Sequence, residues 1–362
     1  MRKIWLFAIN VAAILVILAL AWWAELVQMF LPGRSSLHTY NFSASKEHYA
    51  FLHRTAERKH VLVVVDDRAR KISAYDAATG PILAAQFLMD GRLQITVGPR
   101  INPPFSPEGL ESTLYTCDLG TASCARAFSS SGTIKSAMPI SGGRFLFVGA
   151  YLETTADPMA PTKPFLAYRS FDFYLYAPDR ALTNLTDSRA FQLGPVSYGG
   201  GQAVFDMAQR KPPGTKRPTS EVFCARVDQD FVPIDFAADT AEPCVSYGRD
   251  IDVYPNISPD GKHVAFLSAS DSNKSGWIYE IVIVEMGSKR HVRSIRPREG
   301  ETMSLSPPVF IDDDTIRYVE RVGDTYAFYS YSISTGKVAT HFELDSAQIT
   351  NSTPHIIGQA GE

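Results

Sequence analysis

The chain has 362 residues, 45% of them hydrophobic, and a formal net charge of −3. This balance excludes a protein whose overall electrostatic field attracts nucleic acid. The length matches one closed ring of repeats of about 50 residues each, which excludes a second large domain.

The N-terminal segment predicts a membrane anchor. Arg2 and Lys3 precede an uncharged apolar stretch over residues 4–24, which as a helix crosses the ~30 Å hydrocarbon core of a bilayer. The two basic residues place the N-terminus in the cytoplasm and everything after the anchor outside it. The alternative is a signal peptide cleaved near Ala19-Leu20-Ala21. The candidate anchor contacts are Trp5, Asn10, Trp22 and Trp23.

A β-rich unit recurs six times between about His60 and Leu344, roughly every 40–60 residues, as in propellers, solenoids and arrays. Each copy begins with a turn and an apolar strand, most clearly Ser258–Gly261 before Lys262–Leu267. Pro and Gly specify this turn because Pro fixes φ and Gly adopts positive φ. We assign His60–Val65 as the corresponding strand of the first unit, although no such turn precedes it. Weaker turns occur at Met89–Arg92, Ser141–Arg144, Ser197–Gly201 and Asp312–Asp314.

Each copy ends in a hairpin whose β-branched and aromatic residues alternate with polar ones, as half-buried strands require. The clearest is Phe328–Leu344; the others are Ile72–Gly80, Leu114–Phe128, Phe171–Leu185, Val222–Phe236 and Tyr279–Ile295. Four strands per unit predict an all-β fold, a six-bladed β-propeller preceded by one transmembrane helix. A β-sandwich is the alternative. The expected domains are an anchor over 1–24, a linker over 25–45, the propeller over 46–346 and a tail or closing strand over 347–362.

Four long connections separate the expected second and third strands: Gly98–Thr113, Glu153–Lys163, Gln209–Ser220 and Ser268–Gly276. Equivalent loops of consecutive blades emerge on one face of a ring, and three of these are rich in Pro, which lowers the entropy lost on binding. We therefore predict a partner-binding loop crest made of these connections; the alternative is that they are tolerated insertions. The candidate contacts are Arg100, Pro104, Pro161, Lys163, Arg210, Lys211, Lys216 and Arg217.

The four cysteines fall into two local pairs. Cys117 and Cys124 flank the turn of one hairpin, where a cross-strand disulfide is geometrically reasonable, and Cys224 and Cys244 surround a later hairpin. Their spacing lacks the pairs typical of zinc sites. Disulfides fit the oxidising compartment that the anchor predicts; the alternative is four buried free thiols.

The sequence shows no motif for catalysis. Neither G-x-S-x-G nor H-E-x-x-H occurs, and the eight His are scattered. Asp312-Asp313-Asp314 lacks the alternating spacing of a calcium loop. We therefore assign no catalytic residue, no metal site and no cofactor, and favour a protein that is not an enzyme. Carboxylate pairs brought together from separate blades leave glycoside hydrolysis open.

The segment Asn256–Leu267, followed by Ile278–Val284, resembles the TolB-type propeller repeat, one of the WD-repeat-like propeller families. The same repeat occurs in the propeller domains of prolyl-oligopeptidase-type proteins. The resemblance implies a six- or seven-bladed propeller and a protein-binding role in the bacterial envelope. The chain departs from the family because only the predicted anchor and linker precede the propeller, where TolB-like proteins carry a separate N-terminal domain. No α/β-hydrolase domain follows it, unlike in the peptidases.

Together these patterns predict a single-pass, membrane-anchored propeller that acts as a protein-interaction module or accessory subunit of a membrane or envelope complex. The alternative function is a pore-centred hydrolase or a propeller that binds a carbohydrate or small ligand. Five Asn lie in N-x-S/T triplets, which would be glycan acceptors in a eukaryotic secretory protein. The alanine-rich, asparagine-poor composition instead favours the bacterial periplasm, with the eukaryotic secretory lumen or cell surface as the alternative. The expected partners are the membrane and one or more envelope proteins, without nucleic acid.

Overall fold

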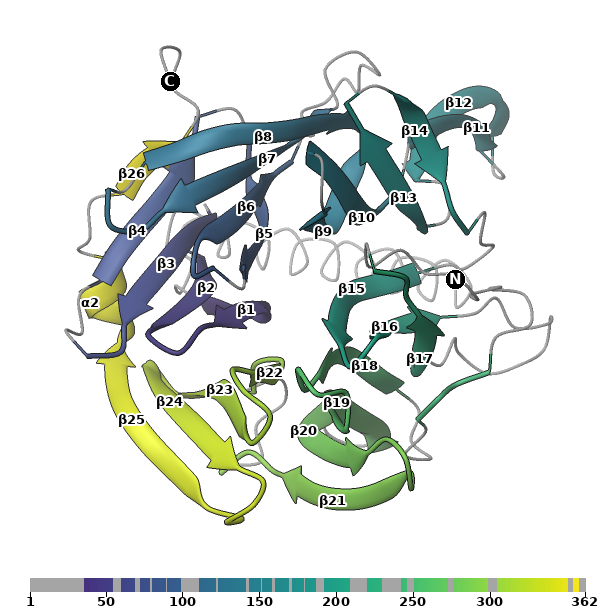
Figure 1. Cartoon of the computed structure of the whole chain (residues 1–362). Coiled ribbons are helices and arrows are strands. Elements are labelled where there is room, and N and C mark those ends of the chain that lie inside the picture. Colours follow the sequence, from purple (N-terminus) through teal and green to yellow (C-terminus); the bar gives the residue numbers. More distant parts are fainter. Residues whose placement is uncertain are drawn as a thin grey trace, which may run out of the picture.

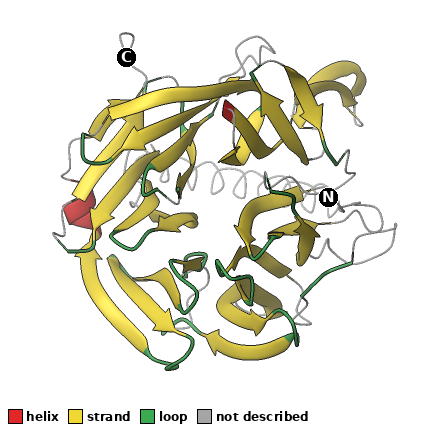
Figure 2. Ribbon diagram, in the orientation of Figure 1, coloured by secondary structure: helices red, strands yellow, loops and turns green. Residues whose placement is uncertain are grey.

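The computed structural model describes residues 36–54, 60–68, 72–78, 80–88, 90–98, 111–121, 123–140, 143–150, 152–157, 160–168, 171–178, 180–186, 192–208, 220–229, 242–245, 251–272, 276–298, 305–350 and 354–357. Strands dominate these residues (Figure 2). The predicted anchor, residues 1–24, lies outside them. Within them, no helix is both long and apolar enough to cross a bilayer.

The first half of the chain forms three sheets, whose strands follow one another from the centre of the molecule outward. The first contains β1 (Ser36–Ala44), β2 (His48–Arg54), β3 (His60–Asp66), β4 (Ile72–Ala77) and, from the end of the chain, β26 (Pro354–Ile357). The second contains β5 (Ile82–Phe87), β6 (Leu93–Val97), β7 (Glu111–Asp118) and β8 (Ser123–Ser131). The third contains β9 (Thr133–Ile140), β10 (Arg144–Ala150), β13 (Asp172–Ala177) and β14 (Arg180–Asn184). Between β10 and β13, a separate hairpin consists of β11 (Leu152–Asp157) and β12 (Ala160–Tyr168).

The second half begins with a seven-stranded sheet of β15 (Gln192–Gly199), β16 (Gln202–Ala208), β17 (Ser220–Arg226), β18 (Ile251–Ile257), β19 (His263–Ser272), β20 (Gly276–Glu285) and β21 (Arg290–Ile295). Its two parts, β15–β17 and β18–β21, pair through Ser220 and Ile251 in parallel. The last sheet contains β22 (Val309–Phe310), β23 (Thr315–Val322), β24 (Thr325–Ser332) and β25 (Val338–Asp345). The short helix α2 (Ser346–Thr350) then leads to β26.

The sheets are arranged around a ring, with β1, β5, β9, β15, β18 and β22 facing its centre (Figure 1). Buried apolar side chains fill the wedges between neighbouring groups of strands. Phe173 of β13 meets Phe205 of β16 in one wedge, with ring centroids 5.1 Å apart, and Phe51 of β2 meets Phe328 of β24 in another, at 5.7 Å. The core is therefore distributed between blades, which is the arrangement of a β-propeller.

Glycine contacts join two of the predicted turns. Gly200 (φ +56°) follows β15 and Gly261 (φ +75°) follows β18, and a Cβ on Gly200 would lie 2.5 Å from the Cα of Gly261. The Gly200 amide also donates to the Pro259 carbonyl at 2.9 Å. Gly200 and Gly261 are therefore needed both for positive φ and for the close approach of two blades.

A polar network joins the last sheet to the first. Arg317 of β23 is 5% exposed in its side chain, and its Nη2 donates to Asp67 Oδ2 at 2.6 Å and to the Lys46 carbonyl at 3.0 Å. Its guanidinium lies 4.5 Å from the ring centroid of Tyr49. On the other side of Asp67, His341 Nδ1 lies 3.2 Å from Oδ1. We refer to Arg317, Asp67, Tyr49 and His341 as the closing cluster, because they connect residues from opposite ends of the chain.

Three expectations differ from the structure. Residues 36–44, inside the predicted linker, form β1 and belong to the first sheet, because β1 pairs with β2. His60–Val65 is the third strand of its sheet, and β2 takes the place of the second strand. The turn before β2 is not predicted from the sequence because it lacks Pro and Gly. Ser45 nevertheless stabilises this turn as Ser258 stabilises its own: Ser45 Oγ accepts from the His48 amide and Ser258 Oγ from the His263 amide, both at 3.0 Å.

The third difference is that two of the expected long loops contain paired strands: residues 153–157 and 160–163 belong to the β11–β12 hairpin, and residues 268–272 belong to β19, which pairs with β20. At the end of the chain, residues 354–357 form β26, which pairs in parallel with β4 and buries Ile357. The second strand of the predicted hairpin Val222–Phe236 lies mostly outside the described residues, and within them Val222 pairs with Val245.

The glycine contact gives a stability prediction with an internal control. Gly200→Ala and Gly201→Ala both place a Cβ at positive φ, which costs about 1–2 kcal/mol. A Cβ on Gly201 would have nothing within 4 Å, whereas one on Gly200 would meet Gly261. We expect Gly200→Ala to lower the free energy of unfolding by roughly 1–3 kcal/mol more than Gly201→Ala, measured by urea denaturation. Equal losses would contradict the close approach of the two turns.

The closing cluster gives a second prediction. Arg317→Met leaves the half-buried carboxylate of Asp67 without its cation, and we expect a loss of about 3 kcal/mol in the free energy of unfolding. Arg68→Met is the matched control, because the Arg68 side chain is 83% exposed and its substitution should cost less than about 0.5 kcal/mol. An Arg317→Met variant as stable as the control would show that the cluster does not hold the ring closed.

Candidate functional site: the central cavity

A cavity of about 1070 Å³ lies at the centre of the ring, with walls that include residues of the innermost strands β1, β5, β9, β15, β18 and β22. Its volume is at or above the upper end of the ~300–1,000 Å³ typical of small-ligand sites. Among the described residues, the wall is mostly neutral and includes Gln86, Pro195, Tyr198, Tyr254 and Phe310. It is therefore large enough for a ligand or an inserted peptide segment.

Hydrogen bonds between neighbouring innermost strands build this wall. The Phe87 amide donates to Ser43 Oγ at 2.9 Å and the Val196 amide to Ser136 Oγ at 3.4 Å. In the same way, the Ile257 amide donates to Ser197 Oγ at 3.2 Å and the Phe310 amide to Asn256 Oδ1 at 2.8 Å. The partners are 44, 60, 60 and 54 residues apart, so each bond repeats with the sequence unit. An edge amide that would face the cavity is thereby satisfied by the preceding blade.

Most of the innermost strands carry an irregularity in their pairing. The register shifts between Ile82 and Ala84 in β5, opposite residue 135 in β9, between Leu193 and Val196 in β15 and between Val253 and Asn256 in β18. A bulge leaves residues outside the ladder and re-aims their side chains. This explains why Pro195 and Pro255 are tolerated within strands, since a bulged residue needs no ladder amide.

Lys135 is the bulged residue of β9 and lines the cavity. Its Nζ lies 3.9 Å from the centroid of the Phe171 ring. Burial lowers the pKa of Lys135 to about 8, although the negative charge of Asp206 opposes this shift. Among the wall residues that the described innermost strands contribute, Lys135 is the one charged side chain.

Asp206 of β16 lies behind the wall and is fully buried. The Tyr254 amide donates to its Oδ1 at 2.9 Å and the Ser220 hydroxyl to its Oδ2 at 3.4 Å. Gly194 is required beside it, because a Cβ there would lie 1.9 Å from Oδ1. Burial raises the pKa of Asp206, while the Tyr254 amide and the charge of Lys135 partly counteract it. Asp206 thus holds Tyr254, at φ +54°, in the wall.

A Ser–His–Asp arrangement occurs away from the cavity and shares His341 and Asp67 with the closing cluster. Ser330 Oγ lies 2.9 Å from His341 Nε2, and His341 Nδ1 lies 3.2 Å from Asp67 Oδ1. Ser330 lies inside β24, paired with Arg317 on one side and Ala339 on the other, so the backbone around it belongs to the sheet. Asp67 also binds Arg317. We interpret the arrangement as structural, because a nucleophilic serine needs free amides beside it to stabilise an oxyanion.

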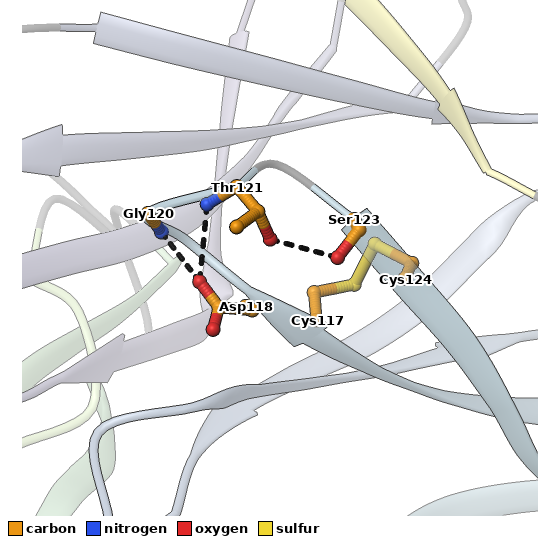
Figure 3. Close-up of a disulfide and its surroundings, with 6 residues drawn as sticks. All are labelled: Cys117, Asp118, Gly120, Thr121, Ser123 and Cys124. Atoms are coloured by element: carbon orange, nitrogen blue, oxygen red, sulfur yellow. Dashed lines mark hydrogen bonds between the residues drawn. A yellow bond between two sulfur atoms is a disulfide. The ribbon is translucent and has the colours of Figure 1, made fainter.

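The predicted disulfides are confirmed, between Cys117 and Cys124 and between Cys224 and Cys244. Figure 3 shows the first, which joins β7 and β8 next to a turn in which Asp118 Oδ1 accepts from the Gly120 and Thr121 amides at 2.8 and 3.1 Å. Cys117 and Cys124 are directly paired across the two strands. The two disulfides indicate an oxidising, extracytoplasmic compartment.

Most of the other predicted site residues lie outside the described part of the chain: Trp5, Asn10, Trp22, Trp23, Arg100, Pro104, Arg210, Lys211, Lys216 and Arg217. Pro161 and Lys163 are part of strand β12. Within the described ranges, no group of three or more His, Cys, Asp or Glu side chains is placed to hold a metal ion.

Sequence patterns do not reveal Lys135, Asp206 and Tyr254 as site residues. One signal is present, since a Pro stands shortly before the turn in several units, including Pro195 and Pro255, and these mark the bulges of the inner strands. Nothing comparable marks Lys135, because its bulge occurs in a stretch without Pro at that position.

No protein-family model matches the chain, and no curated protein sequence is similar to it. Solved structures are similar in fold. TolB from Acinetobacter baumannii superimposes with a TM-score of 0.52 at 14% identity, over 81% of this chain and 62% of TolB. The fold is a TolB-like β-propeller.

Other similar structures have different roles. A polysaccharide lyase of the ulvan lyase family has a TM-score of 0.51 at 9% identity over 87% of both chains. Kuenenia stuttgartiensis hydrazine synthase has a TM-score of 0.51 at 10% identity, over 77% of this chain and 41% of its own. These likenesses show the fold alone, because one propeller supports many functions.

The buried carboxylate gives a pH-dependent prediction. Because burial raises the folded-state pKa of Asp206, the folded state binds more protons than the unfolded state above pH ~4, and this group lowers stability as pH rises. Asp206→Asn keeps an acceptor for the Tyr254 amide without the charge. We expect the stability of this variant relative to wild type to increase between pH 4.5 and 7.5 in urea denaturation. Asp324→Asn, on a side chain 78% exposed, should show no such trend; the same trend in both would contradict the assignment.

Proposed function

We propose that this protein is a six-bladed, membrane-anchored extracytoplasmic propeller that acts as a protein-interaction module, an accessory subunit of a membrane or envelope complex. The observation that carries this proposal is the position of three long connections at one end of consecutive sheets. They follow β6, β10 and β16 and precede β7, β13 and β17, so each joins the second strand of a sheet to the third. The corresponding connections β2–β3, β19–β20 and β23–β24 are short, so the loop crest is limited to three of the four connections expected from the sequence.

Antiparallel order supports a common face for these connections. The turns β1–β2 and β3–β4, and their equivalents in the other sheets, emerge at one end of the strands, and the second-to-third connections emerge at the other. Function is commonly located on loops held by a rigid scaffold. The loop crest is therefore the surface best suited to a partner protein.

Two features support six blades. The seven-stranded sheet divides at the Ser220–Ile251 pair into two blades, with Val245 adding to β17 through its pairing with Val222. The β11–β12 hairpin is an insertion between the second and third strands of one blade. With these assignments, the first three strands of each blade follow the same order from the centre outward.

Two features support the location. The disulfides indicate an oxidising compartment. The uncharged segment over residues 4–24, after Arg2 and Lys3, has the length and flanking charge of a signal anchor whose C-terminal side faces the periplasm. The alternative function, a hydrolase or ligand-binding propeller, has the central cavity in its favour.

A loop exchange tests the interaction. The intact chain is purified from native membranes in mild detergent beside a variant in which Gln209–Arg217 is replaced by a short Gly/Ser turn. We expect a stoichiometric partner to co-purify with wild type and to be lost from the variant, with unchanged thermal unfolding, because the replacement leaves the paired residues of β16 and β17 in place.

The matched control removes cations from the opposite end of the strands. Arg68→Gln, Lys262→Gln and Lys289→Gln lie in exposed turns and should leave the partner bound. Full binding by the loop variant would contradict the proposal, and so would equal loss of the partner from both variants.

A further inference from the structure

We infer that the ring is oriented with its loop crest toward the bilayer, so that the partner of the crest is a membrane-embedded protein. This inference rests on the proposed anchor and crest, and it adds the orientation of the ring and the kind of partner. We call the side of the ring that carries the second-to-third connections the crest face. The opposite side, with the β1–β2 and β3–β4 turns and their equivalents, is the turn face.

The direction of β1 is the first step. Ser36 pairs with Arg54 and Ala44 with Tyr49, so β1 begins beside the end of β2 and runs from the crest face to the turn face. β1 is also one of the strands that face the centre of the ring (Figure 1). The chain that precedes Ser36 is therefore attached to the ring at its crest face, on the inner side of the first sheet.

The length of the chain before β1 is the second step. Eleven residues, 25–35, separate the uncharged segment over residues 4–24 from Ser36. Fully extended, they span at most about 40 Å. With the turn face toward the bilayer, they would have to cross the four strand spacings of the first sheet and then follow a strand such as β2, with seven residues. These two distances are roughly 19 and 23 Å, which together exceed the full extension.

The charge of the crest face is the third step, and it favours a protein over a lipid surface. Arg296 and Arg298 follow the end of β21 at this face, and each Nε lies near a carboxylate, at 3.0 Å from Glu280 Oε2 and 2.9 Å from Glu320 Oε2. The connection over residues 209–219 instead has four cations and no acidic residue. A basic charge confined to one connection suits an acidic site on a protein better than the uniform charge of anionic headgroups.

The orientation decides which proteins reach the crest. Because the eleven residues span at most about 40 Å, the crest face stays within that distance of the bilayer surface. The extracytoplasmic part of a protein embedded in the same membrane occupies this space, whereas the turn face is open to the rest of the compartment. The partner is therefore a membrane-embedded protein with an acidic extracytoplasmic surface.

The orientation is tested first, without any partner. The full chain is placed in phospholipid nanodiscs whose headgroups carry an acceptor dye, and a donor dye is attached to one introduced cysteine. Glu111→Cys places the donor at the start of β7 on the crest face, where the side chain is 52% exposed. Lys262→Cys places it in the β18–β19 turn on the turn face, at 74% exposed. The native cysteines do not react, because both described pairs are disulfides.

We expect energy transfer about twofold or more higher from the Glu111→Cys donor, because a strand of eight residues such as β7 separates the faces by up to roughly 26 Å. Equal or higher transfer from the Lys262→Cys donor would overturn the orientation. That outcome leaves the loop-exchange result unchanged, so the orientation can fail while the proposed interaction stands. Transfer from neither donor would contradict the anchor, and with it both the proposed location and this inference.

A photoreactive cross-linker on the same two cysteines tests the kind of partner in native membranes. We expect the Glu111→Cys probe to capture one protein, and to lose it when Gln209–Arg217 is replaced, while the Lys262→Cys probe does not capture it. In cells that lack this chain, that protein should remain in the membrane pellet after alkaline extraction. The inference is overturned if alkaline extraction releases the captured protein, or if the Glu111→Cys probe captures phospholipid alone or nothing.

Discussion

The rest of the structure depends on how each innermost strand is held to the next. A β-blade buries its faces against its neighbours, but the inner edge of its first strand faces the central cavity with unpaired amides. In at least four places a Ser or Asn side chain of one blade accepts the amide of the next, as Asn256 does for Phe310 at 2.8 Å. These bonds fix the spacing of blades around the cavity. Farther from the cavity, apolar side chains such as Phe173 and Phe205 pack between neighbouring blades.

The same constraint shapes the cavity. Strands that converge on an axis must deviate from regular pairing, and β5, β9, β15 and β18 do so by bulges. Bulged residues are released from the ladder, so this position in the unit accepts Pro, Tyr or Lys without damage to the sheet. The apolar cores between the blades keep the scaffold rigid. The residues of the cavity wall and the loops between the second and third strands of each blade can therefore vary. This separation between frame and variable positions is consistent with the different roles of proteins that share the fold.

The repeat makes the fold predictable, because Ser258-Pro259-Asp260-Gly261 and its weaker copies specify turns chemically. Where the turn chemistry changes, the prediction is wrong. Ser45-Lys46-Glu47 has neither Pro nor Gly, so the sequence pattern places the first unit one strand too late and leaves β1 in the linker. Contacts between distant residues carry no local signal: Arg317 and Asp67 are 250 residues apart. The disulfides are predictable because the cysteines of each pair are close in the sequence, 7 and 20 residues apart, whereas Lys135 and Asp206 belong to different blades.

Hydrogen exchange of four backbone amides tests the central claim most directly. The amides of Phe87, Val196, Ile257 and Phe310 lie at the cavity, where water would exchange them rapidly if they were unpaired. The account predicts protection of Phe87, Ile257 and Phe310 close to that of ladder amides, with weaker protection at Val196, whose bond is longest at 3.4 Å. It also predicts that Asn256→Ala removes protection at Phe310 and leaves Phe87 unchanged. Rapid exchange at all four in the folded wild type would contradict the account.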